Sequence, residues 1–243
     1  MSQSVKRAAD ILDVIAARPS TVAQLAEAFG IHRSTMFREL QTLVQVGFAR
    51  RLPDGAYAPS FRLAVLGNAA LEGLDLRSVA FAHVRRLHRA VGNTVHVGAL
   101  VDDEVVYVDK AEDSGGIRMY SRVGSAVRPQ CSAIGKAILA GLPVHRRDAV
   151  LADVDWRRYT DRTITSRARL DVELERVARQ GWAADDGEFE DFVNCVAVPV
   201  MSPAGVVGAL SLTALRVVED LPRLQERLPL LQHTAAQISR ELG

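Results

Sequence analysis

Cys195, His96 and Asp185 have the three side-chain types that together could support covalent catalysis in this chain. A cysteine thiolate can attack a substrate, a histidine can take up the thiol proton, and a carboxylate can orient the histidine. However, six histidines and two cysteines in 243 residues make such a set easy to find by chance. Cys195 also lies inside an apolar run, where a cysteine usually packs as a small hydrophobic residue with a raised pKa. We therefore predict no enzyme activity, and a cysteine hydrolase is the least favoured alternative.

The Gly135-Lys136 pair could belong to a phosphate-binding loop, whose backbone N–H groups hold nucleotide phosphates. That loop requires a glycine where this chain has Gln130, so nucleotide hydrolysis is not expected. Ser132 can instead cap the helix that follows it, and the unpaired N–H groups of such a helix form an anion site in principle. The alternative is an ordinary capped helix without a ligand.

A different chemistry, recognition of nucleic acid, is indicated between residues 21 and 47. Two short amphipathic segments meet at Gly30, which can adopt the left-handed conformation that ends one helix before another begins. An apolar stripe of helical period runs along the second segment and consists of Met36, Leu40, Leu43 and Val44. Arg38 lies on the opposite face among short and amide side chains, which suit phosphates and base edges. This pattern predicts a helix-turn-helix.

Residues 48–57 follow at once and have the pattern of a β-hairpin with an Asp-Gly turn, which predicts a wing. Arg50 and Arg51 would lie on this wing, within reach of the DNA backbone or minor groove. The alternative is that helix 32–46 is only core and Arg38 only a solvated side chain. The predicted DNA-contact residues are Arg33, Ser34, Thr35, Arg38, Gln41, Arg50 and Arg51.

Length and composition favour two domains, because 243 residues with 48% hydrophobic content can form two ordinary cores. Residues 1–70 hold eight Lys/Arg and five Asp/Glu, a net charge of +3, whereas residues 71–243 hold 22 and 24, a net charge of −2. No run resembles a membrane span or signal peptide, so a cytoplasmic protein without a membrane partner is expected.

Both cysteines are isolated in sequence, so we expect reduced thiols and no disulfide, metal site or cofactor. Control of DNA binding by oxidation of Cys131 or Cys195 is an alternative function.

The remaining elements are predicted from hydrophobic periodicity and turn residues. The expected helices are 4–17, a second helix capped by Thr21, 61–76, 77–90, one from Ser132 to Pro143, 170–181 and 221–242. The expected strands are two within 94–112 separated by Asp102-Asp103, one at 116–124, and a hairpin of 193–201 with 206–215. Helices between and after antiparallel hairpins indicate an α+β second domain.

At this point the sequence resembles the IclR family of bacterial transcriptional regulators over nearly its whole length. The resemblance rests on SVKRAADIL, IHRSTMFRELQTL with its wing, RVGSAVRPQCSAIGKAILA, DDGEFEDFVNCVAVPV and GALSLTA. It implies a winged helix-turn-helix domain (1–62), a linker helix (63–78) and a GAF-like α/β effector-binding domain (79–243). It also implies a homodimer that assembles into a homotetramer and binds double-stranded DNA at a pseudo-palindromic operator.

By position in the family, the resemblance implies effector contacts from Ala133, Ile134, Asp185, Cys195, Ser211 and Thr213. We add Ser132 as the helix cap and Met119, Phe189 and Phe192 as candidates for an apolar wall, although Phe192 replaces a glycine that is common in the family. Since most members repress catabolic operons, we expect a repressor. The expected effector is a small organic acid or a related hydroxylated or amide compound.

Overall fold

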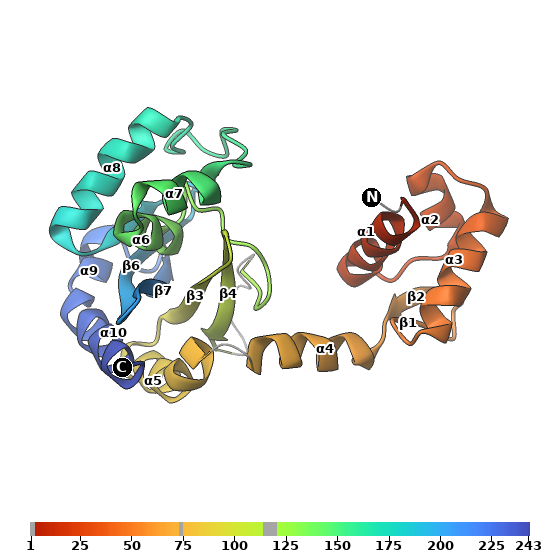
Figure 1. Cartoon of the computed structure of the whole chain (residues 1–243), viewed down its shortest axis with the longest axis horizontal. Coiled ribbons are helices and arrows are strands. Elements are labelled where there is room, and N and C mark those ends of the chain that lie inside the picture. Colours follow the sequence, from red (N-terminus) through yellow and green to blue (C-terminus); the bar gives the residue numbers. More distant parts are fainter. Residues whose placement is uncertain (1–2, 73–74, 114–120) are drawn as a thin grey trace. The chain divides into compact units, whose positions relative to one another are not determined.

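The computed structural model describes the backbone of residues 3–72, 75–113 and 121–243, with the side chains of 70–72 excepted. Contacts divide the chain into two compact units, Met1–Leu71 and Glu72–Gly243 (Figure 1). The division falls inside the segment predicted as a linker. No helix among the described residues is long and apolar enough to cross a membrane.

The first unit contains three helices and a two-stranded hairpin. They are α1 (Gln3–Ala17), α2 (Val22–Phe29), α3 (Arg33–Gln45), β1 (Ala49–Arg51) and β2 (Tyr57–Pro59). Its core consists of Ile11, Ile15, Leu25, Ala26, Met36, Leu40, Leu43, Ala49 and Tyr57. The predicted apolar stripe is therefore confirmed, and burial of this stripe against α1 and α2 turns the opposite side of α3 toward solvent.

Local caps explain why α2 and α3 are separate helices. The Thr21 hydroxyl accepts from the Gln24 backbone N–H while the Gln24 side chain accepts from Thr21 N at 2.8 Å, a complete capping box. Gly30 ends α2 at φ 62°, and the His32 side chain caps the start of α3. The predicted helix-turn-helix is confirmed, with the left-handed glycine at the turn.

The wing is also confirmed. β1 and β2 pair antiparallel, with Arg50 opposite Ala58 and Arg51 opposite Tyr57. The second strand begins at Tyr57, where the predicted hairpin ended, so the loop is longer than the Asp-Gly turn alone. The Asp54 side chain shapes this loop by accepting from the Ala56 backbone N–H at 3.0 Å.

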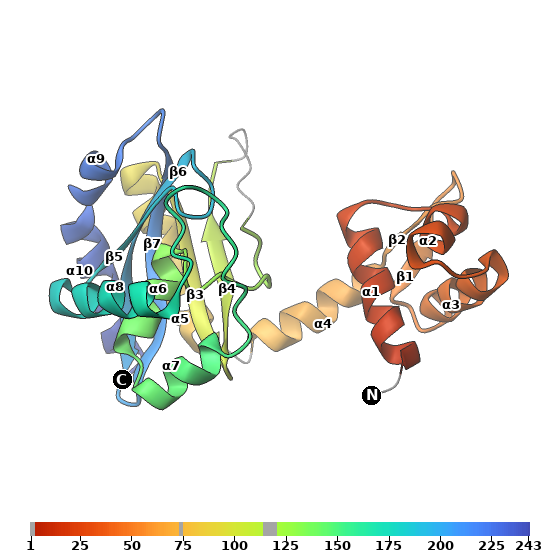
Figure 2. The ribbon, with the colours of Figure 1, turned by 90° about the horizontal axis from the view of Figure 1, so that it is seen from above.

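The second unit is built on one antiparallel sheet with the order β4-β3-β7-β6-β5. Its strands are β3 (Thr94–Val101), β4 (Glu104–Ala111), β5 (Ala183–Asp186), β6 (Val193–Ser202) and β7 (Gly205–Leu215). On one face lie α6 (Ala133–Gly141), α7 (Val144–Leu151) and α8 (Arg167–Gln180), and on the other lie α5 (Asp75–Val91), α9 (Leu221–Gln225) and α10 (Leu228–Glu241) (Figures 1 and 2). Alternating apolar residues on both faces of the sheet require this cover.

Several predicted elements differ from the structure. The helix predicted over 61–76 ends earlier, as α4 (Phe61–Glu72), and Leu76 is a buried residue in the first turn of α5. The helix predicted over 221–242 is divided into α9 and α10, because Pro229 has no N–H and suits the first turn of a new helix. The helix predicted from Leu170 begins three residues earlier, at Arg167, behind the Ser166 cap.

Two elements were not predicted. β5 has the sequence AADD, which has no strand preference of its own and forms because it pairs with β6. α7 follows Pro143 directly and was too short and polar to be recognised. The strand predicted over 116–124 falls largely outside the described residues, and its described part, 121–124, is not a strand.

Candidate functional site: an exposed recognition face and a buried cavity

Strand register brings together polar residues that are far apart in the sequence. On β5, β6 and β7, Asp185 lies opposite Cys195, which in turn lies opposite Thr213. One row further along β7, Ser211 lies opposite His96 of β3. Residues opposite one another on neighbouring strands project from the same face of a sheet, so all five side chains lie under α6.

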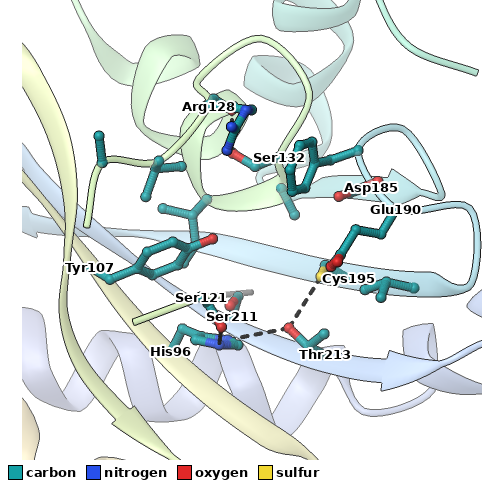
Figure 3. A pocket seen from close by; sticks show the side chains of 16 residues that line it. His96, Tyr107, Ser121, Arg128, Ser132, Asp185, Glu190, Cys195, Ser211 and Thr213 are labelled. Atoms are coloured by element: carbon teal, nitrogen blue, oxygen red, sulfur yellow. Dashed lines mark hydrogen bonds between the residues drawn. The ribbon is translucent and has the colours of Figure 1, made fainter. Parts of the chain in front are cut away.

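These side chains line a cavity between the sheet, the start of α6 and the loops before α6 and after β5 (Figure 3). Its volume of about 60 Å³ admits only a small molecule without rearrangement. Its polar side chains are His96, Tyr107, Ser121, Arg128, Ser132, Asp185, Glu190, Cys195, Ser211 and Thr213, and its remaining walls include Ile134, Phe189 and Val193. A concave cavity in which polar groups converge beside apolar side chains is suited to binding a small molecule.

One side of the cavity is a chain of hydrogen bonds between uncharged groups. His96 Nε2 lies 2.7 Å from Ser121 Oγ, and His96 Nδ1 lies 3.3 Å from the Thr213 hydroxyl. Burial lowers the pKa of His96 to about 3, and Lys110 adds to the effect. The imidazole is therefore neutral at physiological pH, and each ring nitrogen donates or accepts according to its tautomer.

A buried cluster of charges lies close to the cavity residue Asp185, outside the lining itself. Lys136 is fully buried, forms an ion pair with Glu188, and has its Nζ 3.6 Å from a Glu173 carboxylate oxygen. Burial raises the pKa of Asp185 to about 7, and repulsion from Glu188 adds to the shift. A carboxyl group that keeps its proton near neutral pH can donate a hydrogen bond to a ligand.

The start of α6 has the predicted cap. The Ser132 hydroxyl accepts from the Gly135 backbone N–H at 3.1 Å and donates to the Arg128 carbonyl at 2.8 Å. Gly135 has no room for a side chain, because a Cβ there would lie 2.4 Å from Pro129 Cα. The helix start is therefore held closely against the loop that carries Arg128.

Most of the predicted effector residues lie together. Ser132, Ala133, Ile134, Asp185, Cys195, Ser211 and Thr213 all line the cavity, as does Phe189. Phe192 does not line it: this side chain is 46% exposed and lies on an outer surface, so it is not part of the apolar wall of this cavity. Met119 lies outside the described residues.

Two charged cavity residues, Arg128 and Glu190, were missed. Both fall inside the sequence runs that carried the family resemblance, but neither lies on a helix or strand whose period would indicate its direction. The position of Arg128 in the sequence was itself a signal. It precedes the predicted cap Ser132 by only four residues, in the loop that leads to the start of that helix.

The hydrolase alternative fails on geometry and protonation. The Thr213 hydroxyl lies between the other two groups, 3.1 Å from Cys195 Sγ and 3.3 Å from His96 Nδ1. Asp185 accepts from the Glu188 backbone N–H at 2.7 Å, so it orients that loop. Burial raises the pKa of Cys195, which leaves a protonated thiol next to a neutral imidazole.

The redox alternative gains no support from the surroundings of the cysteines. Burial raises the pKa of Cys131 to about 12, with a further increase from Asp185, and burial also raises the pKa of Cys195. Both are free thiols. Oxidation requires thiolate character, which both environments suppress.

On the first unit, the outward face of α3 presents Arg33, Ser34 and Arg38 as exposed residues, while Thr35 and Gln41 are half-buried. The Ser34 hydroxyl lies 2.8 Å from His32 Nδ1, so part of its bonding capacity serves the cap. Arg50 and Arg51 are exposed on β1, and Arg50 Nε also donates to the Pro59 carbonyl at 3.3 Å. Cations and hydroxyl groups on one helix and its wing suit contacts to a duplex.

Phe37 is a feature of this face that the sequence analysis missed. It is 44% exposed and directly precedes Arg38 of the predicted contact set, although a phenylalanine in an amphipathic helix is usually assigned to the core. An exposed aromatic side chain on such a helix can contact a thymine methyl group.

Both units of the chain match domains of known proteins. The IclR helix-turn-helix domain matches residues 4–53, and the bacterial transcriptional regulator IclR C-terminal domain matches residues 68–240. The chain is 36% identical to the HTH-type transcriptional regulator KdgR of Escherichia coli K12, covering 91% of this chain and 85% of KdgR. It is 33% identical to XynR, an HTH-type transcriptional regulator of the same strain, covering 99% and 97%.

A solved structure gives the same result for the fold. The crystal structure of Thermotoga maritima IclR superposes with a TM-score of 0.81 at 32% identity, covering 99% of this chain and 98% of that one. The chain therefore belongs to the IclR family of DNA-binding transcriptional regulators, which are not enzymes and carry an effector-binding domain at the C-terminus.

Proposed function

We propose that this protein is a sequence-specific repressor of a catabolic operon and that a small organic acid, or a related hydroxylated or amide compound, changes its affinity for DNA. The observation that carries the proposal is the cavity under α6. Neutral hydrogen-bonding groups on one side of this cavity face charged groups on the other, and apolar side chains form the rest of its wall. A cavity of this kind in the same chain as a winged helix-turn-helix supplies the two sites that ligand-controlled DNA binding requires.

The proposed DNA contacts are Arg33, Ser34, Thr35, Arg38, Gln41, Arg50 and Arg51. Arg38 lies at the middle of the exposed face of α3, where a guanidinium can bond two acceptors of a guanine at once. The wing residues Arg50 and Arg51 are better suited to phosphates, because they lie beside the helix that would occupy the major groove.

The proposed effector contacts are Met119, Ser132, Ala133, Ile134, Asp185, Cys195, Ser211 and Thr213. An acid group of the ligand would accept bonds at the start of α6, while Ser211 and Thr213 offer hydroxyl groups. Asp185 would repel a bound anion unless it holds a proton or accepts a bond from the ligand. This favours acids that also carry a hydroxyl or amide group over simple fatty acids.

We further propose that the active species is a dimer or a tetramer of identical chains. α4 exposes Phe61, Val65 and Leu66, which are 82%, 65% and 48% exposed. Large apolar side chains gathered on one helix are typical of a surface that another chain covers. Two recognition helices related by a two-fold axis would read a pseudo-palindromic operator.

The test measures DNA binding and ligand binding on the same protein. The DNA upstream of the protein's own gene and of its neighbours would be used as probe, with candidate hydroxy acids and amides added at saturating concentrations. A true effector changes the DNA affinity, and DNA changes the effector affinity by the same factor. Calorimetry on the wild type, Asp185→Ala and Ser211→Ala should show weaker effector binding by the two variants. Equal affinities in all three proteins would place the effector site elsewhere.

A further inference from the structure

Arg128 is the only Lys or Arg side chain among the described residues that line the cavity. Lys136 lies nearby, but it is buried against Glu188 and Glu173 and does not line the cavity. His96 is neutral at physiological pH because burial lowers its pKa to about 3. Among the side chains that line the cavity, Arg128 is therefore the one that adds a full positive charge to the N–H groups at the start of α6, because its guanidinium stays charged throughout the physiological range.

The backbone of Arg128 is fixed to the start of α6. Its carbonyl accepts from the Ser132 hydroxyl at 2.8 Å, and the next residue, Pro129, packs against the Cα of Gly135. The same serine caps the helix. The Cα of Arg128 is therefore held in place by the element that forms one wall of the cavity.

The side chain is held as well. The guanidinium carbon of Arg128 lies 4.2 Å from the centroid of the Phe189 ring and 5.3 Å from that of Tyr159, and Arg128 Nε donates to the Tyr159 hydroxyl at 3.0 Å. The two rings meet edge to face at 4.9 Å. Stacking on aromatic rings keeps the cation in one position, so less side-chain entropy is lost when a ligand binds.

The surrounding charges limit which ligands can bind next to Arg128. Asp185 and Glu190 also line the cavity, and burial raises the pKa of Glu190 although Arg128 opposes the increase. A dianion such as a phosphate ester would meet two carboxyl groups with one cation to balance them. A monocarboxylate brings one negative charge fewer, and the raised pKa values of Asp185 and Glu190 reduce its repulsion by the two carboxyl groups.

Figure 3 shows Arg128 and Ser132 on one side of the cavity and His96, Ser211 and Thr213 on the opposite side. We propose that Arg128 selects an effector that is a small monocarboxylate, with a hydroxyl group at its other end that bonds the His96, Ser211 and Thr213 side. The inference rests on the proposed function of the cavity as the effector site and adds the residue that discriminates an acid from its neutral amide.

The experiment uses the full-length protein and matched pairs of small hydroxy acids and their amides: glycolate, 3-hydroxybutyrate and 4-hydroxybenzoate, each with its amide. Affinities are measured by calorimetry for the wild type, Arg128→Met, Arg128→Lys and the control Arg179→Met, which changes an exposed arginine on α8. Thermal unfolding of each variant reports whether it is folded.

For the wild type we expect at least one acid to bind about tenfold or more tightly than its amide, the range of a charge-assisted hydrogen bond. Arg128→Met should reduce this ratio to about one while amide binding is kept, Arg128→Lys should retain part of it, and Arg179→Met should leave it unchanged. Equal weakening of acid and amide in both Arg128 variants overturns the inference, as does a wild type that binds none of the acids. Ligand binding that leaves the DNA affinity unchanged would contradict the proposed function and leave the selectivity of Arg128 standing.

Discussion

The outward face of α3 belongs to a single helix of 13 residues and lies at the surface, whereas the cavity draws its side chains from β3, β4, β5, β6, β7, the start of α6 and the loops around it. On this face Arg33 and Arg38 are exposed, and the buried side of the helix is apolar at Met36, Leu40 and Leu43. Around the cavity, charged groups such as Lys136, Glu188 and Asp185 are themselves buried. Substitutions on the recognition face should therefore change binding with little effect on folding, while those around the cavity should change both.

The largest loss of stability should follow from Lys136→Met, which leaves Glu188 buried without its cation. Removing one partner of a buried ion pair costs about 3 to 5 kcal/mol. Urea unfolding of the second unit, followed by the fluorescence of its two tryptophans, Trp156 and Trp182, would measure the loss. Recovery of part of the loss in Lys136→Met/Glu188→Met is the matched control. A single variant as stable as the wild type would remove the distinction between the two regions.

On the recognition face, Arg38→Ala should weaken binding to the specific operator by about 1 to 3 kcal/mol through loss of a bidentate base contact. Its unfolding midpoint should stay that of the wild type, because the side chain is exposed. Arg50→Ala and Arg51→Ala should instead weaken binding similarly on all sequences and lower the salt slope by about one unit each.

Fluorescence anisotropy on specific and scrambled duplexes at several salt concentrations measures all three variants. Arg179→Ala in the second unit is the control. Unchanged affinities and salt slopes for the Arg38, Arg50 and Arg51 variants would show that DNA binds elsewhere.

A pH experiment isolates the buried carboxyl of Asp185. Its pKa is raised from 3.8 to about 7 in the folded protein, first by burial and then by Glu188. Between these two values the folded state binds more protons than the unfolded state, so stability from this group is present at low pH and is lost as pH rises toward 7. Asp185→Asn should remove this loss, which is at most about 1.4 kcal/mol per pH unit.

Urea unfolding of wild type and Asp185→Asn at pH 5, 6, 7 and 8 tests the prediction. The difference between the two proteins should grow with pH in favour of the variant up to about 7 and then level off. A difference that does not depend on pH would show that Asp185 is ionised throughout.

The smallest effect concerns a cap on the first unit. Thr21→Ala removes the side-chain half of the capping box of α2 and should cost about 1 kcal/mol in the stability of that unit. Thr21→Ser is the matched control, since its hydroxyl keeps the bond to the Gln24 backbone N–H. Thermal unfolding monitored by circular dichroism would measure both, and equal destabilisation of the two variants would show that the methyl group matters more than the cap.

The helix-turn-helix could be predicted in detail because its determinants are local. The stripe of Met36, Leu40 and Leu43 fixes which side of α3 is buried, Gly30 ends α2, and the turn after Arg51 closes the wing. Each of these depends on residues only a few positions apart, so the position of Arg38 on the exposed face follows from the helical period alone.

The cavity could be predicted only in part, and mainly through resemblance to a family. Strand register decided that Asp185, Cys195 and Thr213 lie in one row, and β5 itself forms only because β6 offers a partner. The raised pKa of Asp185 comes from burial beneath α6 and from Glu188, which no local pattern reveals.

The sequence by itself determined the helix-turn-helix with its wing, the recognition face and the cap at Ser132, because these follow from periodicity and from bonds between near neighbours. Only the tertiary structure decided that Arg128 lines the cavity and stacks on Phe189, and that Thr213 separates Cys195 from His96. The physical reason is that loops have no period to indicate where a side chain points. Their direction is set by close packing, such as that of Pro129 against Gly135, between parts of the chain that meet only when the domain is folded.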